Sequence, residues 1–343
     1  MIDNKNLFDL KCPLCKGKTE IKDKAFPSYE SHITYSIYHC INCKVAFTDS
    51  QIVDTSDLYD NLYRNGSKVR YYDRYWLFAE NVKQINDPLN YLANSEETYW
   101  GVRESLKNLI KDKSKAKILE VGSGLGYLTF ALNKVGYKTV GLDISPTAVA
   151  SANLNFGEHY ISSDIYKYVN EKPGFFDIVV LTEVIEHVID PISFLEVLLK
   201  IVKPNGKVIL TTPNKSFYPS NITWASDLPP VHLWWFSEDS ISFIADMLSS
   251  KVTFLNFTRY YKKNPKWINP YDIAVPAFDE NGRLLNYHLG DDKLTIVYYL
   301  RTALSKVPLL KKSFLYLKRT LYRNVIICDH KGPVICAIIE KNF

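Results

Sequence analysis

The sequence has no uncharged stretch close to the roughly 20 residues that a membrane-spanning helix needs, so it predicts no such helix. Met1 is closely followed by Asp3 and Lys5, where a secretion signal would place an apolar core. Internal repeats and low-complexity segments are also absent, and the 46% hydrophobic content excludes wholesale disorder. We therefore expect a soluble, cytoplasmic protein.

Glycine is scarce, at 14 of 343 residues, so a cluster of glycines is informative. Acidic residues are nearly as numerous as basic ones, and the net charge is only +5. That balance is uneven, because residues 251–343 hold 16 basic and 7 acidic side chains, a balance of +9, which leaves −4 for residues 1–250. The basic character of the C-terminal part should therefore reflect what that part contacts.

Short apolar runs alternate with amphipathic stretches through the middle of the chain. They predict strands over residues 117–121, 138–142, 159–161, 176–181 and 207–211, with helices near 126–135, 145–154, 191–202 and 237–249. Two further strands are expected over 252–260 and 333–340. Alternation of this kind indicates an α/β fold with a parallel sheet covered on both faces.

Three of the scarce glycines, Gly122, Gly124 and Gly126, lie between the first of these strands and a helix. Glycine is needed where the backbone turns tightly and approaches a ligand, and the free amides of a helix N-terminus favour a carboxylate or phosphate. Asp143 ends the next strand, where it could hold ribose hydroxyls. The glycine spacing differs from the G-x-G-x-x-G of dinucleotide loops.

The glycine loop with Glu120 before it, then Asp143, Ser163-Asp164-Ile165 and the strand that begins at Asp177, resembles in order the motifs of class I S-adenosylmethionine-dependent methyltransferases. The resemblance covers about residues 100–260 and implies a Rossmann-like seven-stranded methyltransferase sheet, with S-adenosylmethionine as methyl donor. The residues it assigns to the donor are Glu120, Gly122, Ser123, Gly124, Gly126, Tyr127, Asp143, Ile144, Asp164, Ile165 and Thr182. A parallel-sheet domain with an empty or different nucleotide site is the alternative.

Glu183, Glu186 and His187 follow the fourth strand, and ligands of open α/β sheets bind beyond the carboxyl ends of the strands. This Glu-x-x-Glu-His cluster resembles that of ubiquinone-biosynthesis O-methyltransferases and of small-RNA 2′-O-methyltransferases, where it binds a divalent ion. His232, before an aromatic run, resembles the second histidine of the RNA enzymes. We expect Glu183, Glu186, His187 and His232 to be catalytic, or to bind Mg²⁺ or another divalent ion. A role in positioning the acceptor without metal, or a structural role, is the alternative.

Cys12, Cys15, Cys40 and Cys43 form two Cys-x-x-Cys pairs with a strand expected between them. Their spacing is typical of a Cys₄ zinc ribbon, whose structural Zn²⁺ would hold about 50 residues that are too few to form a core of their own. Reduced thiols or redox pairs are the alternatives. A ribbon before such a domain resembles a group of ribosomal-RNA methyltransferases and a group of sugar methyltransferases.

The expected organisation is a zinc ribbon over residues 1–50, a helical lid or linker over 51–115, a methyltransferase domain over 116–261 and 332–343, and a basic helical insertion over 262–331. The lid would include Tyr71, Tyr72, Arg74 and Trp76. Residues 294–323 hold seven basic and no acidic side chains. Such a stretch indicates peripheral membrane contact, a clamp for a phosphate-rich substrate, or a helix packed on its own protein.

Together these features predict an S-adenosylmethionine-dependent methyltransferase that acts on oxygen of a small-molecule or saccharide acceptor, a lipid-linked saccharide being one option. An RNA methyltransferase that grips RNA through the ribbon is a second hypothesis. The third is a catalytically silent S-adenosylmethionine-binding module that serves a partner.

Overall fold

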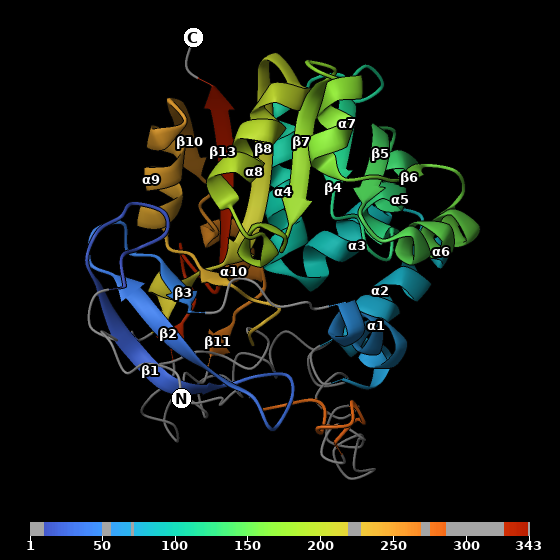
Figure 1. The fold of residues 1–343 in the computed structure, drawn as a ribbon. Helices are drawn as coiled ribbons and strands as arrows, with labels where there is room; N and C mark the ends of the chain where they lie inside the picture. Colours follow the sequence, from blue (N-terminus) through green and yellow to red (C-terminus); the bar gives the residue numbers. More distant parts are fainter. Residues whose placement is uncertain are drawn as a thin grey trace.

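The computed structural model describes residues 10–49, 56–69, 72–218, 228–268, 275–285 and 326–341. Its centre is a seven-stranded sheet in the order β10-β13-β8-β7-β4-β5-β6 (Figure 1). The strands are β4 (Lys117–Val121), β5 (Lys138–Asp143), β6 (Tyr160–Ser162), β7 (Phe176–Thr182), β8 (Val202–Pro213), β10 (Ser250–Phe254) and β13 (Val334–Lys341). β13 runs antiparallel to its neighbours β8 and β10, and the other neighbours pair in parallel. The expected seven-stranded Rossmann-like sheet is confirmed.

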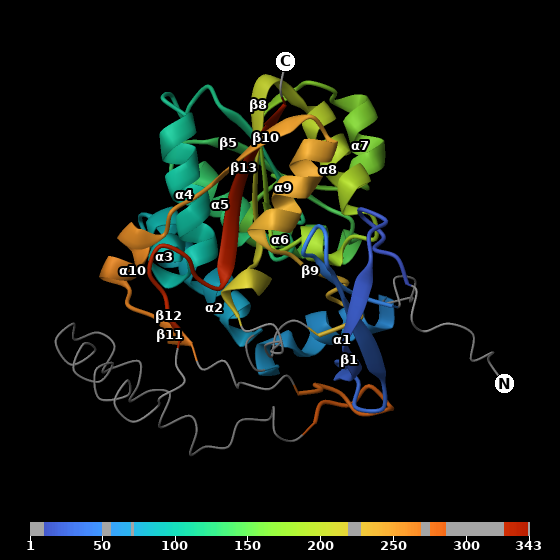
Figure 2. The same ribbon diagram turned by 90° about the vertical axis from the view of Figure 1, so that its left-hand side faces the viewer.

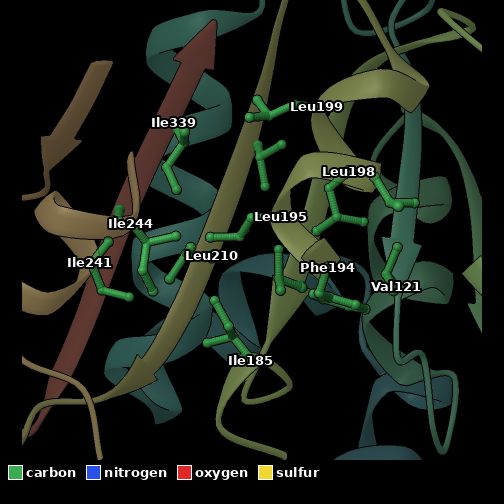
Figure 3. Packing of buried hydrophobic residues seen from close by; sticks show 14 of the residues in the cluster. Val121, Ile185, Phe194, Leu195, Leu198, Leu199, Leu210, Ile241, Ile244 and Ile339 are labelled. Atoms are coloured by element: carbon green, nitrogen blue, oxygen red, sulfur yellow. The ribbon is translucent and has the colours of Figure 1, made fainter. Parts of the chain in front are cut away.

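Helices cover both faces of this sheet because its central strands are apolar on both sides. One face packs on α7 (Ile165–Glu171), α8 (Pro191–Ile201) and α9 (Glu238–Met247), and the other on α3 (Pro88–Ser95), α4 (Glu97–Leu109), α5 (Tyr127–Lys134) and α6 (Pro146–Phe156). Alternate residues of one strand serve the two faces: Leu119 joins the first core and Ile118 the second. Figure 3 shows Phe194, Leu195 and Leu198 of α8 packed over the first face.

The N-terminal region forms a second sheet from β1 (Thr19–Pro27), β2 (Thr34–Cys40), β3 (Ala46–Thr48) and β9 (Trp234–Trp235). The first three strands follow one another in the sequence, but β9 comes from the segment just before α9. Figures 1 and 2 place this sheet at the end of the molecule toward which the parallel strands run. Because Tyr38 and Phe47 share a core with Trp234 and α8, the N-terminal sheet packs directly against the central fold.

Helices α1 (Ser56–Asn65) and α2 (Asp73–Asn81) lie at the same end of the molecule (Figure 1). Single 3₁₀ turns are η1 (Gly66–Lys68), η2 (Val82–Gln84), η3 (Ile185–His187) and η4 (Lys215–Phe217). The remaining elements are α10 (Thr258–Lys263) and the pair β11 (Trp267–Ile268) and β12 (Ile326–Ile327). Within the described ranges no helix combines the length and the apolar character that a membrane crossing requires.

The strand expected over 252–260 is correct only for residues 252–254. β10 ends at Phe254, and the Asn256 side chain accepts a hydrogen bond of 2.9 Å from the amide of Thr258, where α10 begins. Tyr260 and Tyr261 then bury their rings from helical positions, so their aromatic character reflects burial rather than strand structure. Residues 294–323, the basic stretch, lie outside the described residues.

Candidate functional site

A cavity of about 250 Å³ lies at the carboxyl ends of β4 and β7. Its walls come from the glycine loop, the turn after β7, helices α1 and α2, and the segment before β9. Of the residues expected to hold the donor, those that line it are Glu120, Gly122, Ser123, Gly124, Tyr127 and Thr182. Glu183, His187 and His232, expected on the acceptor side, line the same cavity. One space therefore joins the two groups of residues.

The other expected donor residues lie outside this cavity lining. Asp143 is close to it, since its Oδ2 accepts a 2.8 Å hydrogen bond from the amide of Gly124. Asp164 caps α7 by accepting from the amide of Tyr166 at 2.9 Å, and Ile165 is buried in the core. Ile144 is exposed, and Gly126 begins α5. Contact between these residues and a donor stays a prediction.

The glycine loop has a backbone that only glycine adopts without strain. Gly122 has φ +74°, and a Cβ atom there would lie 2.6 Å from Cγ2 of Val184. Gly126 has φ +86°, and a Cβ atom there would lie 2.7 Å from that of Ala152. The amide of Gly122 donates to Leu142 O at 2.8 Å, which fixes the loop to β5. Positive φ and close packing together account for both glycines.

Glu120 brings a carboxylate to the floor of the cavity at the end of β4. Its side chain is 3% exposed and accepts a hydrogen bond from the hydroxyl of Thr129. Burial raises the pKa of Glu120 to about 8, because the charged form loses solvation. A cationic group bound beside it would restore the charged form, which suits the ammonium group of an amino acid.

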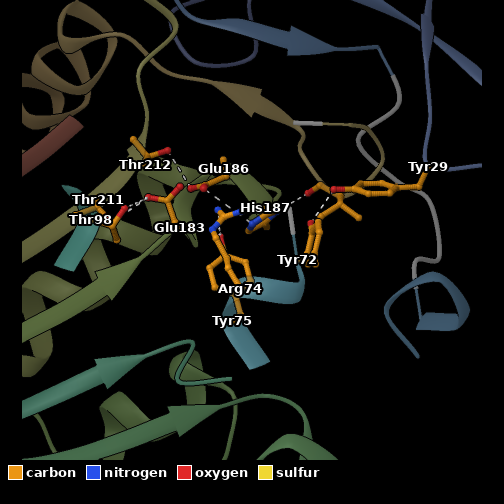
Figure 4. Close-up of polar contacts among 11 residues, drawn as sticks. Tyr29, Tyr72, Arg74, Tyr75, Thr98, Glu183, Glu186, His187, Thr211 and Thr212 are labelled. Atoms are coloured by element: carbon orange, nitrogen blue, oxygen red, sulfur yellow. Dashed lines mark hydrogen bonds and ion pairs between the residues drawn. The ribbon is translucent and has the colours of Figure 1, made fainter. Parts of the chain in front are cut away.

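Glu183 follows the last residue of β7 with φ +56°, a backbone conformation that a residue other than glycine rarely adopts. Its amide donates to Thr211 O at 3.0 Å, and its Oε1 accepts from the hydroxyls of Thr211 at 3.1 Å and Thr98 at 3.5 Å. Figure 4 shows these contacts. Withdrawal from solvent raises the pKa of Glu183 to about 7. The strained turn thus presents to the cavity a carboxylate that can gain or lose a proton near neutral pH.

Glu186, His187 and His232 offer ligand atoms that all lie within 4.8 Å of one another, and Glu183 is outside this group. Glu186 is fully buried, and its Oε2 accepts from the hydroxyl of Thr212 at 2.9 Å. His187 Nδ1 lies 2.6 Å from Val231 O, so it carries the proton, and Nε2 faces Glu186 Oε1 at 4.0 Å (Figure 4). Burial lowers the pKa of both histidines, and the charge of His187 adds to the effect on His232. Two neutral imidazoles beside a carboxylate are a donor set for a divalent ion.

Helix α2 supplies a wall that the aromatic patch in the sequence indicated. Tyr72, Arg74 and Trp76 line the cavity, whereas Tyr71 lies outside the described residues. Arg74 is held by Glu96, with Nε 2.5 Å from Oε1, and it donates to the hydroxyl of Tyr75 at 2.8 Å. The wall is therefore a fixed cationic and aromatic surface.

Two further lining residues, Tyr75 and Tyr99, could not be assigned to the site from the sequence. Tyr75 lies in the aromatic patch itself, and the hydroxyl of Tyr99 contacts that of Tyr127 across the cavity wall. A tyrosine in a helix has the same sequence spacing whether it lines a cavity or packs in a core. The only sequence feature that pointed to this wall was therefore the high density of tyrosine in residues 71–76.

The four cysteines near the N-terminus come together as the spacing predicts. Their sulfur atoms lie within 4.8 Å of one another, with Cys12 and Cys43 at 3.6 Å and Cys15 and Cys40 at 3.3 Å. A tetrahedral zinc site with Zn–S bonds of about 2.3 Å has sulfur atoms about 3.8 Å apart. The hydrogen bond between the side chains of Cys12 and Cys43 lowers the pKa of Cys12 and raises that of Cys43, so without metal this pair holds one thiolate and one thiol.

The two cysteine pairs also share one backbone pattern. The amide of Lys16 donates to Cys12 O at 2.9 Å, and that of Lys44 donates to Cys40 O at 3.2 Å. Both lysines have positive φ, +58° and +61°. Each pair is thus a tight knuckle that turns its sulfur atoms toward the other pair, and the residues present fit a Cys₄ metal site.

Residues 98–246 match the profile of a family described as a methyltransferase domain. The ubiquinone biosynthesis O-methyltransferase of Aliivibrio fischeri (strain MJ11) is 35% identical to this chain over 105 residues, which cover 29% of this chain and 45% of that protein. The protein of the same description from Pseudomonas aeruginosa (strain LESB58) is 35% identical over 106 residues, with the same coverage of both chains. The chain therefore matches less than half the length of these relatives.

Solved structures of S-adenosylmethionine-dependent methyltransferases are also similar to this chain. One is from Archaeoglobus fulgidus, with a TM-score of 0.40, 18% identity, and coverage of 78% of this chain and 99% of that one. Another, described as a possible histamine N-methyltransferase, is from Thermotoga maritima, with a TM-score of 0.44, 13% identity, and coverage of 83% of this chain and 100% of that one.

Proposed function

We propose that this chain, which carries a class I S-adenosylmethionine-dependent methyltransferase domain over residues 98–246, methylates an oxygen atom of a small-molecule or saccharide acceptor. The observation that carries the proposal is the single cavity shared by the glycine loop and by Glu183, His187 and His232. Aligning a donor and an acceptor in one cavity is the main contribution that an enzyme makes to a transfer of this kind.

S-adenosylmethionine, when bound, would supply a methyl group on a positively charged sulfur atom. The loop at Gly122 and Gly124 fits its amino-acid end, because the backbone approaches the cavity there without side chains. Glu120 would meet the ammonium group, and charging of Glu120 in response would strengthen that contact. Asp143 and Asp164, at the ends of β5 and β6, would take the ribose and the adenine.

Glu183 is our choice for the group that removes the proton of the acceptor hydroxyl. It lines the cavity, and its pKa of about 7 lies where a base is half charged at neutral pH and is still able to take up a proton. The hydroxyl of Thr211, 3.1 Å from Oε1, would hold the carboxylate in place. Protonated Glu183 would then release its proton to solvent after product leaves.

Glu186, His187 and His232 would hold a divalent ion, Mg²⁺ or another, whose positive charge favours the ionised form of a bound hydroxyl. The Nδ1 proton of His187 points to Val231 O, so Nε2 would be the ring atom that binds the ion. The hydroxyl of Thr212 donates a hydrogen bond to Glu186 and would hold its carboxylate in the orientation needed to bind the ion. Cys12, Cys15, Cys40 and Cys43 would hold a separate, structural Zn²⁺.

The test separates the two sides of the cavity. Asp143→Ala should weaken S-adenosylmethionine binding by at least about tenfold in calorimetry, because it removes the carboxylate that also fixes Gly124. His232→Ala should bind the donor like the wild type and lose methyl transfer to hydroxylated acceptors. Absence of S-adenosylmethionine binding to the wild type at millimolar donor would refute the proposal.

A further inference from the structure

The segment from Val231 to Trp235 lies between two folded parts of the protein but contains little regular secondary structure. Its only regular element is β9, a strand of two residues. An isolated pair of short strands is at best marginally stable in water, so this segment depends on what it pairs with. One neighbour is the cysteine-rich N-terminal sheet and the other is the turn that carries Glu186 and His187.

On the N-terminal side the segment pairs with β3, which follows closely after Cys43. The amide of Cys40 donates to Val45 O at 2.8 Å, so the start of β3 is tied to the second cysteine knuckle. Phe47 pairs with Trp234 in antiparallel register, and the amide of Thr48 donates to Leu233 O at 3.1 Å. The position of the segment therefore follows from the position of the knuckle.

Aromatic rings extend the same connection. The ring of Phe47 lies 5.7 Å from that of Tyr38 and 5.8 Å from that of Trp234, and Trp234 lies 6.3 Å from Phe236. Trp234 is 1% exposed. Because side chains in such a core are close-packed, a displacement of β3 would be transmitted to Trp234.

On its other side the segment is joined by three hydrogen bonds to the turn after β7, which carries Glu186 and His187. The amide of Leu233 donates to Glu186 O at 2.9 Å, and Trp234 Nε1 donates to Val188 O at 2.8 Å. His187 Nδ1 donates to Val231 O at 2.6 Å. His232 lies within this ladder, with its ring 4.6 Å from that of His187.

We propose that the metal-loaded cysteine ribbon positions His187 and His232, with Phe47 and Trp234 as the positioning residues. The glycine loop is fixed instead by the central sheet, through the bond from Gly122 to Leu142. Zinc occupancy of the ribbon therefore governs the acceptor side of the cavity and leaves the donor side intact. This inference rests on the proposed function, which identifies His187 and His232 as the acceptor side of the cavity. The contacts between the ribbon and these histidines do not depend on that function.

A matched pair of variants tests it. Trp234→Phe removes the hydrogen bond to Val188 O, whereas Trp235→Phe removes an indole whose Nε1 has no hydrogen-bond partner among the residues described. Both side chains are almost fully buried, and both replacements keep an aromatic ring. The readout without substrate is the ring N–H signal of His187 in a histidine ¹H–¹⁵N spectrum, assigned by its loss in His187→Gln.

Trp234→Phe should shift or broaden the His187 signal, keep the donor dissociation constant within about twofold, and lower kcat by about 10- to 100-fold, the scale of a 1 Å misplacement. Trp235→Phe should match the wild type in the His187 signal, the donor dissociation constant and kcat. Cys40→Ser, studied with excess Mg²⁺ so that the ion site at Glu186, His187 and His232 stays supplied, should abolish the His187 signal and still leave donor binding.

An unchanged His187 signal in Cys40→Ser protein that metal analysis shows to lack zinc would overturn the inference. Loss of donor binding together with that signal would also overturn it, since the ribbon would then support the whole fold rather than one side of the cavity. Failure of the proposed function looks different: a wild type with its ribbon metal and an ordered His187 signal that transfers no methyl group.

Discussion

Replacement of Gly122 by alanine probes the donor side of the cavity, and Gly136→Ala is its matched control. Both glycines have positive φ, +74° and +99°. An alanine Cβ at position 136 would meet nothing within 4 Å, whereas at position 122 it would lie 2.6 Å from Cγ2 of Val184. The two replacements therefore share backbone strain and differ in the steric conflict.

The magnitudes follow from these contacts. A left-handed backbone costs an L-residue about 1–2 kcal/mol, so both variants should lose roughly that much unfolding free energy. Carbon atoms normally approach to about 3.5–4.0 Å, so Gly122→Ala must move Val184 by about 1 Å, at a further cost of about 1–3 kcal/mol. Val184 follows Glu183 directly, and Gly122 and Glu183 both line the cavity.

Chemical denaturation and calorimetry with S-adenosylmethionine measure the two effects. We expect Gly136→Ala to bind the donor like the wild type, and Gly122→Ala to bind at least about tenfold more weakly, a difference of about 1.4 kcal/mol. Wild-type donor affinity in Gly122→Ala, or an equal loss in both variants, would refute the assignment of this loop to the donor.

Three further predictions concern Glu183, Glu186 and Arg74. Methyl transfer by the wild type should rise with pH through about 7 as Glu183 loses its proton. Glu183→Gln should lower kcat by about 10²- to 10⁴-fold and remove this pH dependence, while the donor affinity stays unchanged. A pH profile of kcat in the variant that parallels that of the wild type would contradict the role of Glu183 as base. Metal analysis should find a divalent ion in addition to the ribbon metal in wild-type protein but not in Glu186→Ala, and equal metal content would contradict the assigned ion site. Arg74→Met leaves the half-buried Glu96 without its cation and should lower the unfolding free energy by about 1–2 kcal/mol at pH 8, a modest cost because a third of the Arg74 side chain is exposed. That loss should shrink toward pH 5, since burial raises the pKa of Glu96 and the unpaired carboxyl takes up a proton there; a pH-independent loss would contradict it.

Features with a strong local signal were predictable from the sequence. The apolar runs of β4, β7 and β8 are buried on both faces and bounded by helix signals, so their order predicts the parallel sheet. The scarcity of glycine made the loop at Gly122 conspicuous, and the spacing of two Cys-x-x-Cys pairs is typical of a metal-binding ribbon, although the structure has two strands, β1 and β2, where the sequence predicted one. Each of these depends on residues close together in the chain.

What escaped prediction depends on contacts between distant residues. β9 has two residues and hence no period to detect, and only its pairing with β3 in the folded chain makes it a strand. Helix α7 is seven residues long, and Asp164, expected to contact the donor, also serves as its N-cap. The walls made by Tyr75 and Tyr99 arise because α2 and α4 meet the glycine loop, which no local pattern records.

Transfer of tritium from methyl-labelled S-adenosylmethionine into a fractionated cell extract shows which class of acceptor is methylated, with Glu183→Gln protein as the matched control. We expect the wild type to label the small-molecule or saccharide fraction in the presence of a divalent ion, and Glu183→Gln to label it at least about 100-fold more slowly. Label found in RNA or protein, or no label in any fraction from a protein that binds the donor, would contradict the proposed function.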